Sequence, residues 1–127
     1  MTIIAIDGPA ASGKGTIARR LAAELRMDYL DSGLLYRAVA LSAFKKGLNE
    51  ANISQLITIA QNINSMDLIN PDLREEHISQ FSSKLAAIPE VREALISYQR
   101  CFAKQKYGAV LDGRDIGTVI CPDADLK

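Results

Sequence analysis

Two glycines, a lysine and a threonine lie close together near the start of the chain, at a spacing that suits phosphate binding. The segment Gly8–Thr16 reads Gly-Pro-Ala-Ala-Ser-Gly-Lys-Gly-Thr. Its glycines let successive backbone N–H groups turn toward one anion, and Lys14 adds a positive charge that can reach terminal phosphates. A helix behind such a loop contributes free N–H groups and the positive end of its dipole. The pattern predicts a phosphate-binding loop.

The residue after the lysine departs from the commonest form of this motif. Gly15 stands where serine or threonine is usual, and Thr16 follows one position later. The hydroxyl that normally binds Mg²⁺ is therefore missing from its position, and we assign no direct metal ligand. The Gly-Lys-Gly-Thr ending is typical of nucleoside monophosphate kinases such as adenylate kinase. An ordinary strand-to-helix turn is the alternative, which the spacing disfavours.

A second polar segment, Asp31–Arg37, reads Asp-Ser-Gly-Leu-Leu-Tyr-Arg. Asp31 or Ser32 can cap a helix, and the free N–H groups of a helix start together with Arg37 would attract an anion. A capped helix with a surface arginine explains these residues equally well. The segment therefore indicates a second anion site without establishing one.

A third segment, Asp112-Gly-Arg-Asp, follows a short apolar run. Asp112 stands where hydrolytic P-loop enzymes keep an acid for Mg²⁺, and Arg114 could neutralise phosphate charge during transfer. Asp115 could orient an arginine or accept a hydrogen bond from an amino group. A structural turn held by its own Asp–Arg pair is the alternative. His77 is the sole histidine, so a histidine-based triad has no support, and we expect a surface residue.

The elements that must position these residues follow from the apolar periodicity. Residues 2–6 are a continuous apolar run suited to a buried parallel strand. Ile17, Leu21 and Leu25 recur at helical spacing from Lys14 to about Arg26. Further strands are expected at 27–30 and 109–112. A helix is expected from 31 or 32 to a stop at Gly47, and another over 54–63. A third helix is expected to begin at the cap Asn70 with Pro71 and to continue through Leu85. A fourth is expected from Pro89 to a break at Gly108. Residues 62–70 and 112–117 are expected to be loops, 118–121 are unassigned, and 124–127 begin a strand.

Strands that alternate with helices predict an α/β fold with a parallel sheet and crossover connections. Ligands of such sheets bind outside the carboxyl ends of the strands. The segments Gly8–Thr16 and Asp112–Gly117 both follow strand ends, so we expect them at the same edge of the sheet. A shared edge would let one loop act on what the other binds.

Composition narrows the class of protein. The chain has 127 residues, 15 basic and 15 acidic side chains, and two cysteines without metal-type spacing, Cys101 and Cys121. This length suits one domain, and the balanced charge gives no reason to expect nucleic acid or a membrane as partner. Reduced thiols and the lack of a signal-peptide pattern predict a cytoplasmic protein. Because nothing follows the apparent strand start, we expect the front part of a longer protein.

Taken together, these segments resemble the bacterial cytidylate kinase family. The resemblance rests on Gly8–Thr16, on Leu30-Asp-Ser-Gly-x-x-Tyr-Arg37, on Ser83-Lys-Leu-Ala-Ala-Ile-Pro-Glu-Val-Arg92-Glu-Ala-Leu95 and on Asp112-Gly-Arg-Asp-x-Gly-Thr118. It implies a P-loop NTPase-type parallel sheet flanked by helices, with a helical insert that binds the nucleoside monophosphate. Residues 1–36 and 105–127 would form the core, and about 37–104 the insert.

The resemblance implies a phosphotransferase of pyrimidine nucleotide metabolism that uses ATP and Mg²⁺ to convert CMP or dCMP to the diphosphate. It implies a monomer. Lys14, Arg114 and Asp115 would be catalytic. The ATP phosphates would be bound by Gly8, Pro9, Ala10, Ala11, Ser12, Gly13, Lys14, Gly15 and Thr16. CMP would be bound by Ser32, Arg37, Ser83, Arg92, Arg114 and Asp115.

Two departures from the family qualify this expectation. The stretch Asn62–Asn70 is shorter than the substrate-domain insert of many members, and the chain ends before the lid and its arginines. A molecule of these residues alone is expected to have little kinase activity. The alternatives are a non-catalytic nucleotide-binding fragment and a P-loop kinase for UMP, AMP or shikimate. A GTPase switch is disfavoured, because no Asn-Lys-x-Asp segment is present.

Overall fold

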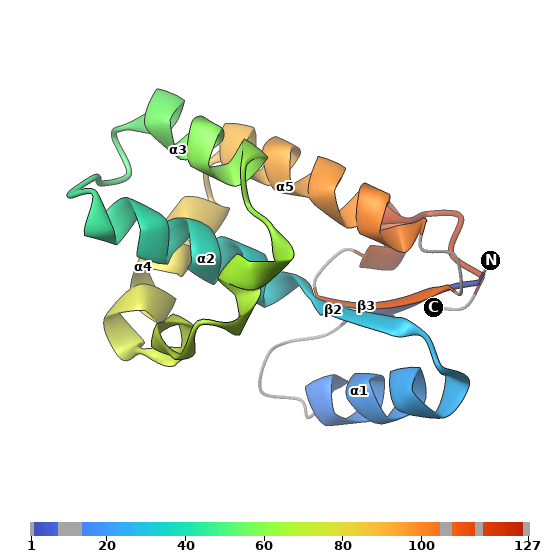
Figure 1. Ribbon diagram of the computed structural model, residues 1–127. Coiled ribbons are helices and arrows are strands. Elements are labelled where there is room, and N and C mark those ends of the chain that lie inside the picture. Colours follow the sequence, from blue (N-terminus) through green and yellow to red (C-terminus); the bar gives the residue numbers. More distant parts are fainter. Residues whose placement is uncertain (1, 8–13, 105–107, 114–115, 126–127) are drawn as a thin grey trace. The chain divides into compact units, whose positions relative to one another are not determined.

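The computed structural model describes residues 2–7, 14–104, 108–113 and 116–125, with only the backbone at 14, 15 and 118 (Figure 1). The chain divides into two compact units. The first comprises Met1–Gly33 and Tyr98–Lys127, and the second comprises Leu34–Ser97. The α/β class expected from the sequence is confirmed, with strands confined to the first unit.

Three parallel strands form the sheet of the first unit. They are β1 (Ile3–Asp7), β2 (Asp28–Asp31) and β3 (Ala109–Gly113), in the order β1-β3-β2. Ala109 pairs with Ile3 on one side and with Asp28 on the other. Every residue of β3 is buried, as expected of a central parallel strand with both faces covered. The predicted parallel sheet is confirmed.

Helix α1 (Lys14–Leu25) covers one face of this sheet (Figure 1). Ile17, Leu21 and Leu25 recur at helical spacing, but Ile17 is 64% exposed and Leu25 46% exposed. The helix packs instead through Ala18 and Ala22, which are buried against the strands. Small side chains let a helix backbone approach a sheet closely, so the alanine face is the one that packs. The predicted helix is confirmed, and of the three apolar residues that predicted it Leu21 also packs against this buried cluster, whereas Ile17 and Leu25 do not.

Two of the helices end in a residue with left-handed backbone conformation. Gly47 has φ +70°, and the next residue, Leu48, donates its N–H to the Ala43 carbonyl at 2.9 Å. This bond across the helix end is the Schellman motif, which favours glycine. Arg26 ends α1 in the same way with φ 56°, although a side chain there is strained. The predicted stop at Gly47 is confirmed.

Glycine is also required where the chain enters β3. Gly108 has φ +94°, and a Cβ atom there would lie 2.6 Å from the Thr2 carbonyl oxygen and 3.2 Å from Met27 Cε. No side chain could occupy that space without moving the backbone of the segment before β1. The helix predicted to run from Pro89 to a break at Gly108 already ends at Ala103, so its predicted end is wrong, and Gly108 instead precedes β3.

The second unit is helical, and two of its helices extend into the first unit in sequence. Its helices are α2 (Ser32–Lys45), α3 (Ile53–Gln61), α4 (Glu76–Ala86) and α5 (Pro89–Ala103). Each buries apolar side chains at helical spacing, as amphipathic helices do. The fully buried leucine, isoleucine and valine residues of these helices are Leu35, Val39, Leu56, Ile78, Leu85, Val91 and Leu95. The helices predicted from 31 or 32, over 54–63 and from Pro89 are therefore confirmed as α2, α3 and α5.

The stretch before α4 differs from the prediction. Residues expected to be a loop form a 3₁₀ turn, η2 (Ser65–Ile69), which Asn64 and Asp67 cap reciprocally. Asn70 caps as predicted, but it caps only a short 3₁₀ turn, η3 (Pro71–Arg74). Glu75 is extended, with ψ 144°, and separates this turn from α4. The single helix expected from Asn70 to Leu85 is therefore wrong.

Beyond β3 the chain forms η4, a π-helical turn over Ile116–Ile120 that packs against β1 and β3. The loop predicted over 112–117 is wrong at both ends, because the first two residues belong to β3 and the last two to η4.

Arg100 of α5 donates to the carbonyl oxygens of Val119 and Ile120, both at 3.0 Å. Asp125 donates its N–H to the Ile3 carbonyl at 2.8 Å and lies in a bend, whereas the rest of the predicted strand start, 126–127, lies outside the described residues. Among the described residues, no helix is long and apolar enough to cross a membrane.

Candidate functional site

Each strand of the sheet brings an aspartate to the same edge. Asp7 ends β1, Asp31 ends β2, and Asp112 is the penultimate residue of β3. The register places Asp31 beside Asp112 and Asp7 beside Gly113. This edge is where parallel sheets bind their ligands. It is also the edge from which the predicted phosphate loop and the segment after β3 depart.

The Asp112 carboxylate is buried, with 1% of the residue exposed. The Tyr29 hydroxyl donates a hydrogen bond to its Oδ2 at 2.9 Å. Burial, this hydrogen bond and the negative charges of Asp31 and Asp112 raise the pKa of Tyr29 well above its ordinary value, and the Arg19 charge opposes them. The contact fixes β2 to β3 at the site edge. Sequence reasoning did not single out Tyr29, since its partner is 83 positions away.

The predicted substrate residue Ser32 is buried at the start of α2, with 5% exposed. Asp31 Oδ1 accepts the Gly33 N–H at 2.9 Å, so Asp31 is the residue that caps this helix. A Cβ atom at Gly113 would lie 1.8 Å from Ser32 Oγ. Gly113 is therefore required by the close approach of Ser32. The structure brings Ser32 to the beginning of the segment that carries Arg114 and Asp115.

Asp7 makes a further link at this edge. Its Oδ1 accepts the Ile116 N–H at 2.6 Å and its Oδ2 accepts the Gly117 N–H at 3.0 Å. Both donors belong to the first turn of η4, where N–H groups have no helical partner. Asp7 directly precedes Gly8. No local sequence pattern signals this contact, because the donors lie 109 and 110 positions away.

Several predicted site residues lie outside the described residues. They are Gly8–Gly13, Arg114 and Asp115. Lys14 and Gly15 begin α1, with only their backbone described, and Thr16 is exposed on its first turn. Within the described ranges, no group of three or more histidine, cysteine, aspartate or glutamate side chains could hold a metal ion. The roles of these residues stay predictions.

The remaining predicted substrate residues belong to the unit Leu34–Ser97. Arg37 is half-buried on α2, and Arg92 is exposed on α5. Ser83 is exposed on α4, where its hydroxyl donates to the Ser79 carbonyl oxygen at 3.3 Å. Ser32 belongs to the other unit. The meeting of these four side chains around one nucleotide is therefore still a prediction.

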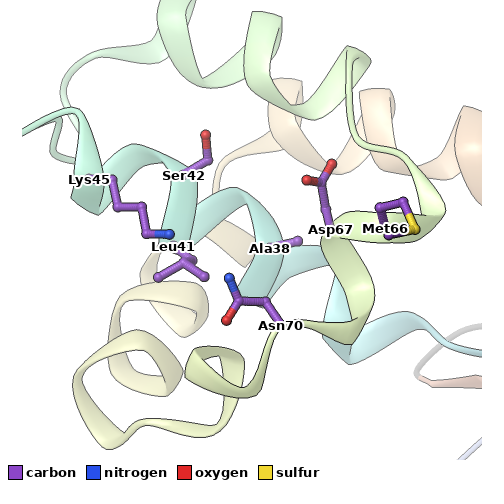
Figure 2. Close-up of a pocket in the computed structure, with 7 residues that line it drawn as sticks. All are labelled: Ala38, Leu41, Ser42, Lys45, Met66, Asp67 and Asn70. Carbon is purple, nitrogen blue, oxygen red and sulfur yellow. The ribbon is translucent and has the colours of Figure 1, made fainter.

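The second unit also contains a shallow pocket of about 200 Å³. Figure 2 shows its lining by α2, η2 and the residue after η2, which supply Ala38, Leu41, Ser42, Lys45, Met66, Asp67 and Asn70. Asp67 accepts the Asn64 N–H and Asn70 accepts the Asp72 N–H, both at 2.9 Å, so their side chains serve as helix caps. No residue predicted to bind nucleotide lines this pocket.

The chain is similar to known proteins over nearly its whole length. A family model for cytidylate kinase matches residues 4–127. The cytidylate kinase of Paramagnetospirillum magneticum is 55% identical over 99% of this chain and 61% of its own length. The cytidylate kinases of Bradyrhizobium sp. and Methylocella silvestris are 51% and 54% identical over 98% of this chain, and over 59% and 58% of their own lengths. The chain thus spans about three fifths of these curated relatives.

Proposed function

Since the chain belongs to the cytidylate kinase family, we propose that it binds ATP and CMP and supplies part of the machinery that phosphorylates CMP or dCMP. The observation that carries this proposal is the contact of Ser32 with Gly113 at the carboxyl edge of the parallel sheet. That contact joins the start of the Asp31–Arg37 segment to the segment of Arg114 and Asp115. The phosphate-loop sequence follows from the same edge, directly after Asp7.

In this proposal, an oxygen of the CMP phosphate attacks the γ-phosphorus of ATP. The bond from that phosphorus to the bridging oxygen of ADP breaks, and ADP leaves with the electron pair. The reaction needs no nucleophilic side chain, because the acceptor is the substrate's own phosphate. The protein's part is positioning and charge neutralisation. We assign the ATP phosphates to Gly8–Thr16, with Lys14 following the transferred group, and the transfer path to Arg114.

We propose that Mg²⁺ binds together with ATP and neutralises the charge of its phosphates. The aspartates of the site edge are oxygen ligands of the right chemical kind. However, Asp7 accepts two N–H groups, Asp31 accepts the Gly33 N–H, and Asp112 accepts the Tyr29 hydroxyl. The described side chains therefore offer no ready set of ligands, and we assign no step to the ion.

Base recognition is the other part of the proposal. Cytosine presents an amino donor beside two acceptors, which an aspartate, an arginine and hydroxyl groups can satisfy. We assign these contacts to Ser32, Ser83, Arg92 and Asp115, with Arg37 at the CMP phosphate. Ser32 is buried, so a base that its hydroxyl contacts would lie in a site with little water. A site built in this way rejects a base that lacks the matching polar group.

The test is release of ADP by this chain from ATP and Mg²⁺ with CMP, dCMP, UMP or AMP as acceptor. We expect CMP or dCMP to be the fastest acceptor, and faster turnover of AMP would contradict the assignment. ATP binding in a calorimeter without turnover of any acceptor would support the alternative of a non-catalytic nucleotide-binding fragment. Lys14→Met should abolish ATP binding, whereas Lys46→Met, at an exposed position after α2, should leave it unchanged.

A further inference from the structure

Asp7 joins two parts of the chain that the proposed function assigns to different substrates. It is the last residue of β1 and directly precedes the segment assigned to ATP. Its carboxylate binds the N–H groups of Ile116 and Gly117 at 2.6 and 3.0 Å. These two residues directly follow Arg114 and Asp115, which are assigned to CMP and to the transfer path. A single side chain thus connects the beginning of one segment with the end of the other.

The geometry of this contact makes it more than a local cap. A residue close in sequence could satisfy the first N–H groups of a helical turn, as Asn64 does for η2. Here the acceptor comes from a different strand, 109 positions earlier. In the strand register Asp7 lies beside Gly113, not beside Ile116. Ile116, three positions after Gly113, therefore also lies beside the end of β1, where the Asp7 carboxylate holds it.

The strength of the contact also supports a positioning role. Each carboxylate oxygen accepts one backbone N–H, and hydrogen bonds to an ionised acceptor are roughly twice as strong as neutral ones. Ile116 is fully buried, and η4 packs against β1 and β3. The start of η4 is thus fixed by packing on one side and by Asp7 on the other.

We propose that Asp7 is a positioning residue that couples ATP binding to CMP binding. This inference rests on the proposed function. Asp7 touches neither substrate in this scheme. It sets the separation between the end of β1 and the start of η4, so that the arrangement which suits ATP is also the arrangement which suits CMP. Binding of one nucleotide therefore raises the affinity for the other, and by linkage the factor is the same in both directions.

The test measures the dissociation constant of CMP in a calorimeter, with and without saturating non-hydrolysable ATP analogue. For the unmodified chain we expect the analogue to tighten CMP binding by at least about 5-fold, the lower end of typical couplings. Asp7→Asn keeps one acceptor oxygen and places an amide donor against the second N–H, so the factor should fall to nearly 1. Asp28→Asn, at an exposed aspartate of β2, is the matched control and should keep the full factor.

A merely structural role would lower both affinities, or the melting temperature, and leave the coupling factor unchanged. That outcome, or a factor near 1 in the unmodified chain, would overturn the inference while leaving the proposed function intact. A chain that binds neither nucleotide would contradict the proposed function itself. If Asp7→Asn does not fold, Asp7→Glu retains both acceptor oxygens, displaced by one methylene group. It should lower the factor partially, and an unchanged factor would count against the inference.

Discussion

Replacing Gly113 by alanine should destabilise the fold, because a new methyl group would meet Ser32. A Cβ atom at position 113 would lie 1.8 Å from Ser32 Oγ and 3.0 Å from Ser32 Cβ. An ordinary contact needs about 3.4 Å, so one of the two groups must move by roughly 1.6 Å. Rotating the hydroxyl away would relieve only the first of these contacts. Both residues are buried, so neighbouring atoms must move as well.

The expected loss follows from these distances. Overpacking a buried site costs about 1–3 kcal/mol, and the size of the required movement favours roughly 3 kcal/mol. Alanine recovers about 0.7 kcal/mol by restricting the unfolded chain. The free energy of unfolding of Gly113→Ala should therefore fall by about 2 kcal/mol. In a urea titration this corresponds to a midpoint lower by about 1 M.

A double-mutant cycle with Ser32→Gly isolates the contact. Ser32→Gly removes both crowded atoms, so the double variant should recover most of the loss, with a coupling of about 2 kcal/mol. Gly33→Ala is the matched control: its Cβ would lie 3.2 Å from Asp31 Oδ1, and its stability should change by less than about 0.5 kcal/mol. A coupling below about 0.5 kcal/mol would refute the reasoning, because the two effects would then be independent.

Three further results are expected. Gly47→Ala should lower the free energy of unfolding by about 1 kcal/mol in a urea titration, since φ is +70° with open space around it; no change would contradict a strained backbone there. Arg26→Gly should raise it by about 0.5 kcal/mol, because φ is 56°, and a loss would count against that strain. Tyr29→Phe should lower it by about 2 kcal/mol at pH 7, because the buried Asp112 carboxylate loses a donor. Because the pKa of Tyr29 is raised in the folded chain, its protonated hydroxyl contributes stability that is fully present below pH 10 and decreases as the pH rises further. Above pH 10 the free energy of unfolding should therefore fall faster with pH for the unmodified chain than for Tyr29→Phe, and equal slopes would contradict the raised pKa.

Local patterns predicted the elements well, because each depends on residues close in sequence. The strand at β3 followed from an apolar run between Gly108 and Asp112, and the end of α2 followed from Gly47. The packing face of α1 was not predictable in this way. Apolar spacing favoured the large side chain of Ile17, whereas contact with the sheet selects the small side chain of Ala18, which is 0% exposed. The break at Glu75 was missed because Asn70 and Pro71 signal a helix start without setting its length.

The described part of the candidate site shows the limits of sequence reasoning more clearly. Ser32 and Asp112 were found because they belong to short segments with recognisable spacing. Tyr29 and Asp7 were missed because their partners are 83 and 109 positions away in the chain. Gly113 was interpreted as part of a loop motif, and only the close approach of Ser32 to the end of β3 shows why a side chain is excluded there.

The central claim is that this site recognises cytosine, and the most direct measurement is a calorimetric titration of the chain with CMP and with UMP. The two nucleotides differ chiefly in whether the base presents an amino donor or a carbonyl acceptor. A site built to bind that amino group should prefer CMP by at least about 100-fold. Equal or tighter binding of UMP would contradict the account.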